Sequence, residues 1–279
     1  MRTATASPTC SNDGASRREH EQFFSVTTVE LMMIVAGSLV VGVLGGVLGV
    51  GGGVFLVPFL IFVADLGPKE AVAASLCCVI GTSASASVIS GRSGLARLDI
   101  ALRLEPALVL GAVIASVLAV RVADGAVLVG FGVLLIVIVG LVVARSRAHV
   151  DVDQPLSAAR RAALVVAGFC SGAASGLFGV GGGVLVVPAL TLIGRMPLKS
   201  AAATSSLCLM SSAACGALVH WSHGLLRIDI VAASMIGVLP GGLLGARLQR
   251  RLDERVLQVA FFVLAAIVAG LSIWRGVHA

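Results

Sequence analysis

Long apolar runs separated by short polar connections fill the chain from about residue 29 to residue 273. A helix needs about 20 apolar residues to cross roughly 30 Å of hydrocarbon. Eight runs reach or approach that length: 29–48, 71–90, 100–120, 127–144, 162–178, 201–219, 230–248 and 256–273. The pattern therefore predicts an all-α polytopic membrane protein with about eight transmembrane helices.

Two further apolar runs are only half as long. Residues 54–63 and 184–193 are ten residues each, which is about 15 Å of helix. Each run follows three consecutive glycines and contains a proline, Pro58 or Pro188. They predict two short segments, broken or re-entrant, in addition to the full spans.

The first short run and its surroundings recur 130 residues later. The sequence GVGGGVFLVP from Gly49 returns as GVGGGVLVVP from Gly179, and GLARLD from Gly94 returns as GLLRID from Gly224. The register holds over roughly a hundred residues without an insertion, so the chain contains two homologous repeats. It divides into a disordered polar tail (1–25), a first transmembrane repeat (26–145), a polar linker (146–161) and a second transmembrane repeat (162–279).

The relative direction of the repeats depends on whether the short runs cross the membrane. Re-entrant runs leave four spans per repeat and parallel repeats, whereas crossing runs give five per repeat and inverted repeats. Lysine and arginine divide 12 inside to 8 outside in the first arrangement, with the N-terminus inside, and 13 to 7 in the second, with the N-terminus outside. Both agree with the enrichment of basic residues on the cytoplasmic side. We expect the first, with eight full spans and two short elements.

Composition supports a chain surrounded by lipid. Hydrophobic residues make up 58% and charged residues 12%, whereas soluble domains have about 25% charged residues. The net charge of +6 comes from basic residues in short loops, which indicates topology signals and not a nucleic-acid surface. Five of the six cysteines lie in apolar runs, without CxxC or Cys/His spacing. We therefore expect no metal, no cofactor and, because no Ser/His/Asp set is apparent, no enzyme.

Each triple glycine predicts a helix break at membrane depth. Backbone groups freed by a break need protein or a water-filled cavity around them, and paired Gly/Pro-interrupted segments in two halves typically mark a transporter's substrate site. A helix that begins just after Gly53 or Gly183 points free N–H groups and its positive dipole end into that cavity. Two such ends suit a small anion, and glycine lets an oxyanion approach the backbone closely.

Close helix packing is the alternative role of these glycines. Gly42, Gly46, Gly172 and Gly176 have the spacing of Gly-xxx-Gly packing motifs. The triple glycines fit binding better, because packing does not require a half-length helix afterwards. A phosphate loop is disfavoured, since no Gly-Lys-Ser/Thr follows and the context is not βαβ.

Hydroxyl groups follow each break at the start of the next span, as Ser75 in the first repeat and Thr204 and Ser205 in the second. They either donate to an anion or bond back to carbonyls of their own helix. Ala74 stands at the position of Thr204, so the two halves do not supply the same hydroxyls.

Charged residues near span ends have structural and functional interpretations. We expect Asp99 and Asp229 to cap the following helices, with Arg97 and Arg227 either paired locally or placed at the membrane interface. Guiding anions into the cavity is the alternative role of the arginines.

Three other titratable residues lie in or beside the spans. Glu105 lies one turn into a span and is a candidate for proton coupling. His220 and His223 lie at the end of a span, and we expect both to be interfacial.

In its paired GxGGGxxxxP segments, each followed by A-x-A-[AT]-S, the chain resembles the TauE/SafE family of sulfite and organosulfonate permeases over residues 29–274. The resemblance implies a multi-pass carrier of small sulfur-containing oxyanions in a bacterial inner (plasma) membrane. It also implies substrate-binding roles at the matching positions. These are Gly49, Gly51, Gly52, Gly53, Pro58, Ser75, Gly179, Gly181, Gly182, Gly183, Pro188, Thr204 and Ser205.

We therefore predict a secondary permease that works by alternating access, with its substrate between the two repeats near mid-membrane. A carrier of another small solute, such as a carboxylate or an amino acid, is one alternative. A membrane scaffold subunit without transport is the other. The expected partners are a small anion and the lipid bilayer, without nucleic acid; a homo-oligomer is compatible with the sequence.

Overall fold

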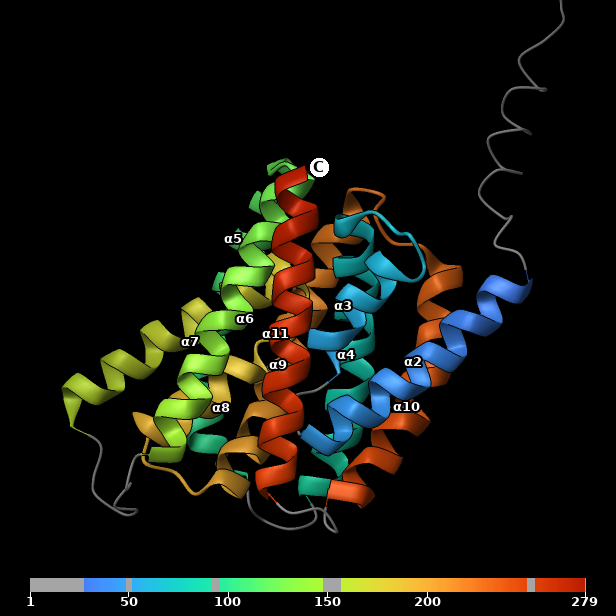
Figure 1. Cartoon of the computed structure of the whole chain (residues 1–279). Coiled ribbons are helices and arrows are strands. Elements are labelled where there is room, and N and C mark those ends of the chain that lie inside the picture. The colour runs from blue at the N-terminus through green and yellow to red at the C-terminus, as the bar shows by residue number, and fades with distance from the viewer. Residues whose placement is uncertain (1–27, 49–51, 92–95, 148–156, 250–253, 279) are drawn as a thin grey trace, which may run out of the picture.

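The computed structural model describes residues 28–48, 52–91, 96–147, 157–249 and 254–278. Within these ranges every regular element is a helix (Figure 1). The helices are α2 (Thr28–Leu48), α3 (Gly53–Phe62), α4 (Pro68–Gly91), α5 (Leu98–Arg121), α6 (Asp124–Arg147), α7 (Ala158–Phe178), α8 (Gly183–Leu192), α9 (Leu198–Ser222), α10 (Ile228–Gln249) and α11 (Glu254–His278). The tail, most of the linker, Gly49 and Gly51 lie outside the described residues.

The prediction of an all-helical polytopic protein is confirmed. Six of the described helices are long and apolar enough to cross a membrane: α2, α5, α6, α7, α9 and α10. Helix α4 has 24 residues but is rich in serine and alanine. Its residues 71–76 are almost completely buried, so protein and not lipid surrounds this part of α4.

Corresponding helices of the two halves begin at the same spacing. The short helices begin at Gly53 and Gly183, and α2 and α7 begin at Thr28 and Ala158, in both cases 130 residues apart. Each short helix has ten residues and keeps its proline inside. The predicted short runs 54–63 and 184–193 therefore form helices shifted by a single residue.

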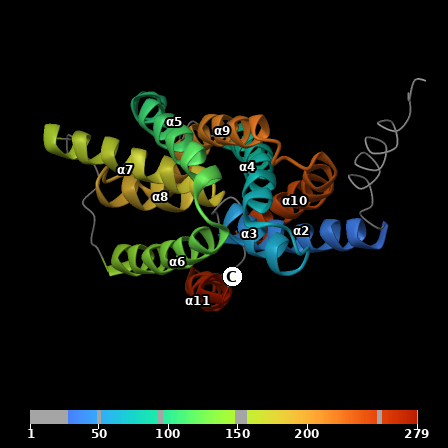
Figure 2. The same cartoon turned by 90° about the horizontal axis from the view of Figure 1, so that it is seen from above.

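Helices of the two halves are interleaved. Helix α2 packs against α10, α7 packs against α5, and α4 and α9 pack against each other between these pairs (Figure 2). Gly42, Gly172 and Gly176 lie in these contacts: a β-carbon at Gly42 would be 2.9 Å from the Cα of Val238. The packing role predicted for these three glycines is confirmed.

The last helices of the two halves run antiparallel. A β-carbon at Gly132, early in α6, would lie 3.0 Å from the Ala269 carbonyl oxygen in α11. A β-carbon at Gly276, near the end of α11, would lie 2.8 Å from the Gly125 carbonyl oxygen at the start of α6. Because α6 and α11 hold corresponding places in the two halves, this pairing fits the inverted arrangement and contradicts the parallel one.

The short helices explain the inversion. Helix α3 runs from the middle of the bundle to the end where the C-terminus lies, and α8 runs from the middle to the opposite end (Figure 1). Each short helix thus completes a crossing instead of returning to the side it came from. The expected arrangement, with re-entrant elements and parallel repeats, is therefore wrong: the two repeats run in opposite directions.

Candidate functional site

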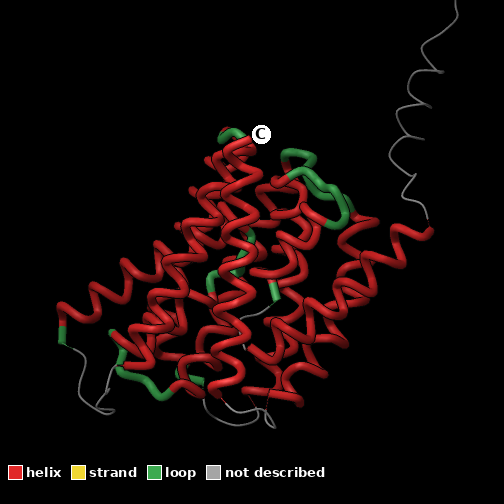
Figure 3. The backbone as a smooth tube through the Cα atoms, in the orientation of Figure 1, coloured by secondary structure: helices red, strands yellow, loops and turns green. Residues whose placement is uncertain are grey.

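The two glycine breaks meet inside the bundle. Non-helical segments lie there near mid-height (Figure 3). A β-carbon at Gly53 would lie 2.8 Å from the Gly179 carbonyl oxygen and 3.0 Å from that of Val180. The first residue of α3 therefore packs directly on the break that precedes α8. Gly53 and Gly179 are both buried.

Glycine is required at the breaks by backbone conformation. Gly52, Gly179, Gly181 and Gly182 have φ angles of 67°, 67°, 72° and 42°. A side chain in this left-handed region costs about 1–2 kcal/mol. These angles turn the chain so that α3 and α8 begin with their N–H groups inside the protein.

Ser75 on α4 joins the two breaks. Its hydroxyl donates to the Gly179 carbonyl oxygen at 2.7 Å, and the Gly53 carbonyl oxygen lies 3.4 Å away. Ser75 is completely buried. In this conformation its hydrogen is directed to a backbone acceptor.

Ser205 on α9 corresponds to Ser75, but its environment differs. Its hydroxyl oxygen lies 3.5 Å from the β-carbon position of Gly183. It is buried and has no hydrogen-bond partner among the described residues. A buried hydroxyl without a partner is uncommon, so a donor is free beside the N-terminus of α8.

Ser175 on α7 adds a second free hydroxyl that the sequence did not indicate. Its Cβ lies 3.5 Å from the β-carbon position of Gly182, and its buried Oγ has no partner within the described ranges. Gly45 stands at the corresponding position of the first half. A search for features shared by both repeats therefore passes over Ser175.

Three predicted site residues lie away from the breaks. The Thr204 hydroxyl donates to the Ser200 carbonyl at 2.7 Å and accepts the Arg97 N–H at 3.0 Å, so it holds the beginning of α5. Pro58 and Pro188 are buried five residues into their helices, about 7 Å along the axis from the breaks.

The charged pairs before α5 and α10 are local. Arg97 Nε lies 3.3 Å from Asp99 Oδ1, and Arg227 Nη2 lies 3.0 Å from Asp229 Oδ2. The predicted capping by Asp99 and Asp229 is wrong, because each is the second residue of its helix. The predicted pairing with the arginines is correct.

The two histidines near the end of α9 differ from each other. His223 is exposed, as predicted. His220 is completely buried, with Nδ1 2.9 Å from the Gly216 carbonyl oxygen. His220 thus lies in the last turn of α9, but its ring is enclosed by protein and does not face the surroundings of the bundle.

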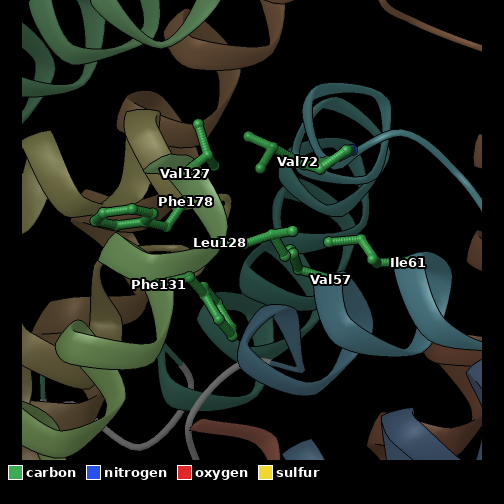
Figure 4. Close-up of a pocket in the computed structure, with 8 residues that line it drawn as sticks. Val57, Ile61, Val72, Val127, Leu128, Phe131 and Phe178 are labelled. Atoms are coloured by element: carbon green, nitrogen blue, oxygen red, sulfur yellow. The ribbon is translucent and has the colours of Figure 1, made fainter. Parts of the chain in front are cut away.

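Two hollows lie near α3. One is an apolar pocket of about 10 Å³ lined by residues such as Val57, Leu128 and Phe178 (Figure 4), which is room for about one water molecule. The other is a cavity of about 320 Å³ at the C-terminal end of α3. Its polar lining consists of Glu30, Asp65, Glu70 and Arg227. Only the second is large enough for a small organic anion.

Comparison with known proteins gives a consistent picture. The family described as "Sulfite exporter TauE/SafE" matches residues 34–272. The probable membrane transporter protein YunE of Bacillus subtilis is 25% identical, covering 89% of this chain and 99% of YunE. A probable membrane transporter protein of Xylella fastidiosa (strain Temecula1) is 30% identical, covering 89% of this chain and 97% of the relative. No solved structure matches the chain.

Proposed function

The chain belongs to the TauE/SafE family, and on that premise we propose that it is a secondary carrier of small sulfur-containing oxyanions such as sulfite or organosulfonates. The family and the relatives support a membrane transporter. The substrate class and its binding place are our proposal. The observation that carries it is the meeting of the two glycine breaks at the start of both short helices.

The second break supplies the groups that an oxyanion needs. At the start of α8 the N–H groups of Gly183, Leu185 and Val186 donate to the Gly181 and Gly182 carbonyl oxygens. The N–H of Val184 is left at the positive end of the helix dipole. The hydroxyls of Ser175 and Ser205, which have no partner within the described ranges, lie beside this helix start. Hydrogen bonds to a charged acceptor contribute about 1.5–3 kcal/mol each, so a few such donors hold a small anion without a basic side chain.

The breaks are closed on each other in this conformation. The β-carbon position of Gly53 is within 3 Å of two carbonyl oxygens, which leaves no space for an anion there. Binding therefore requires the halves to part at Gly53 and Gly179, breaking the Ser75 hydrogen bond. We propose that two duplicated, inverted repeats rock against each other around this place, as alternating access requires.

A transport assay with purified protein in liposomes tests this proposal. Gly182→Ala adds a β-carbon 3.1 Å from Leu209 Cδ2 and 3.2 Å from the Ser171 carbonyl oxygen, at a φ of 42°. Because this β-carbon forces the backbone of the break to shift, we expect uptake of labelled sulfite to fall about tenfold or more. That is the effect of losing one hydrogen bond to a charged acceptor. Gly224→Ala is the control, since its φ is 71° and nothing lies within 4 Å of its β-carbon position.

The outcomes separate the alternatives. Equal sulfite flux in the Gly182→Ala and Gly224→Ala proteins would show that the break is not part of the binding site. If the protein transports a carboxylate or an amino acid and sulfite does not compete, the substrate belongs to that class and not to the sulfur oxyanions. Absence of flux for every solute in correctly folded protein would favour a scaffold subunit.

A further inference from the structure

Two buried serines lie directly beneath the cavity at the end of α3. Ile34 on α2 and Ile230 on α10 line that cavity. Ser38 and Ser234 follow them by four residues, so they lie on the same helix faces, one turn deeper. Both serines are completely buried. Their hydroxyls have no hydrogen-bond partner in the part of the chain that the structure describes.

The two serines stand at successive levels. Helices α2 and α10 run parallel, because a β-carbon at Gly237 would contact Ser38 and one at Gly241 would contact Val43, one turn further along both helices. In this register Ser234 lies level with Ile34, and Ser38 lies one turn deeper. The hydroxyls are therefore spaced along the path from the cavity into the bundle.

The same path continues to the first glycine break. Val238 follows Ser234 by four residues on α10, and its Cγ1 lies 3.8 Å from the β-carbon position of Gly52. Gly52 is the residue before α3. From the cavity to the break, Ser234, Ser38 and the contact with Gly52 therefore follow one another at intervals of about one helical turn.

We propose that Ser38 and Ser234 form a relay that binds the anion transiently between the glycine breaks and the cavity. The inference rests on the transport function proposed above. Each hydroxyl donates one hydrogen bond to an oxyanion in passage. A buried polar group without a partner costs stability, and binding a passing anion supplies the partner that is missing at rest.

The corresponding place in the other half is apolar and closed. Gly168 and Leu104 stand at the positions of Ser38 and Ser234, and a β-carbon at Gly168 would lie 2.7 Å from Leu104 Cδ2. The relay therefore belongs to one end of the molecule only.

The charges of the cavity agree with a relay below it. Its lining has three carboxylates and one guanidinium. Asp65 is paired with Arg275 at 3.0 Å, and Arg227 with Asp229 at 3.0 Å. Because carboxylates repel an anion, the cavity binds it weakly. The hydroxyls of Ser38 and Ser234 beneath the cavity bind it by hydrogen bonds.

Alanine variants test the relay through transport and stability together. We expect Ser38→Ala and Ser234→Ala each to lower the initial rate of sulfite transport about 2- to 10-fold, the effect of one hydrogen bond. The melting temperature should stay the same or rise, because the variants remove a buried unpartnered group. Ser212→Ala is the control: Ser212 is equally buried, but its hydroxyl donates to the Leu209 carbonyl at 3.2 Å.

Unchanged transport in both variants would overturn the relay. A parallel loss of transport and melting temperature would also overturn it, because it would show a purely structural role. Only lower transport with retained stability supports it.

A second measurement does not depend on the substrate. In a protein without its native cysteines, we expect Ser38→Cys and Ser234→Cys to react with a small water-soluble methanethiosulfonate at least about tenfold faster than Ser212→Cys. Equal rates would show that no path opens at these serines. If the wild-type protein carries no sulfite but the two cysteines still react faster, the substrate class is wrong and the path stands.

Discussion

At the scale of single residues, one hydroxyl joins the two halves of the chain. Ser75 donates to the Gly179 carbonyl oxygen across 104 positions of sequence. The corresponding Ser205 hydroxyl has no hydrogen-bond partner in the part of the chain that the structure describes. The two halves thus differ at one pair of equivalent hydroxyl groups: that of Ser75 is bonded across the two halves and that of Ser205 is not.

Replacing Ser75 should destabilise this conformation. Ser75→Ala leaves the Gly179 carbonyl without its donor in a buried place, which costs about 1–3 kcal/mol. We expect a lower melting temperature in detergent, whereas Ser205→Ala removes an unpartnered hydroxyl and should not lower it. A melting temperature unchanged by Ser75→Ala would show that this hydrogen bond does not hold the breaks together.

At the residue level, comparison of the repeats located the helix breaks, because both repeats carry the glycines that form them. Ser75 was singled out because it fits the recurring motif, and the structure bonds it to the Gly179 carbonyl of the other half. Ser175, Ser38 and Ser234 were missed, because glycine or leucine replaces each of them in the other repeat. Nothing in a single apolar run distinguishes a serine bonded to its own helix from one without a partner.

At the scale of helices, the contacts between the two halves depend on glycine. Gly172 of α7 packs on the Leu108 carbonyl of α5, and Gly237 of α10 packs on the Val35 carbonyl of α2. A β-carbon has no room at either place. We therefore expect substitution of these glycines to disturb the helix pairs that connect the two halves.

A pair of alanine substitutions separates packing from helix propensity. Gly172→Ala forces α5 and α7 apart, and we expect a loss of about 1–3 kcal/mol. Gly140→Ala lies on an exposed part of α6 with nothing within 4 Å, and we expect a gain of up to about 1 kcal/mol. Unfolding of both proteins in detergent measures the difference. Similar effects at the two positions would contradict tight packing between α5 and α7.

The sequence predicted where helices lie better than how they are arranged. Apolar runs placed the helices within a few residues, including the two short ones. They did not predict that residues 71–76 of α4 are surrounded by protein, because the serines and alanines of this helix only indicate a less apolar span. Helix direction was also missed, since the distribution of basic residues suited both arrangements.

At the scale of the whole molecule, the inverted arrangement has 13 lysines and arginines on the linker side and 7 on the other. Basic residues are enriched on the cytoplasmic side of membranes. We therefore expect the linker to face the cytoplasm. The cavity at the end of α3 then opens to the outside.

Thiol labelling at two equivalent loops tests this orientation. Gly67 follows α3, and Pro197 follows α8, 130 residues later; both are exposed. In a cysteine-free protein in intact cells, we expect an impermeant reagent to label Gly67→Cys but not Pro197→Cys. In parallel repeats both loops lie on the same side, so identical labelling would contradict the inverted arrangement.

The ends of the molecule also differ in charge. Glu30 and Asp65 line the cavity, whereas Arg160 and Arg195 stand at the corresponding positions of the second half. An anion is attracted to the basic end and repelled at the acidic end. For the anionic substrate proposed above, we therefore expect release at the cavity and no tight binding there.

The interleaving of the two halves also sets the order in which the protein can be made. Helix α10, the main neighbour of α2, begins at Ile228, 180 residues after α2 ends at Leu48. At about 5–20 residues per second, the ribosome needs about 10–35 seconds to reach it. During that time the glycine-rich face of α2 lies against lipid or the insertion machinery. Substitutions on this face therefore act on a newly made chain before they act on the finished carrier.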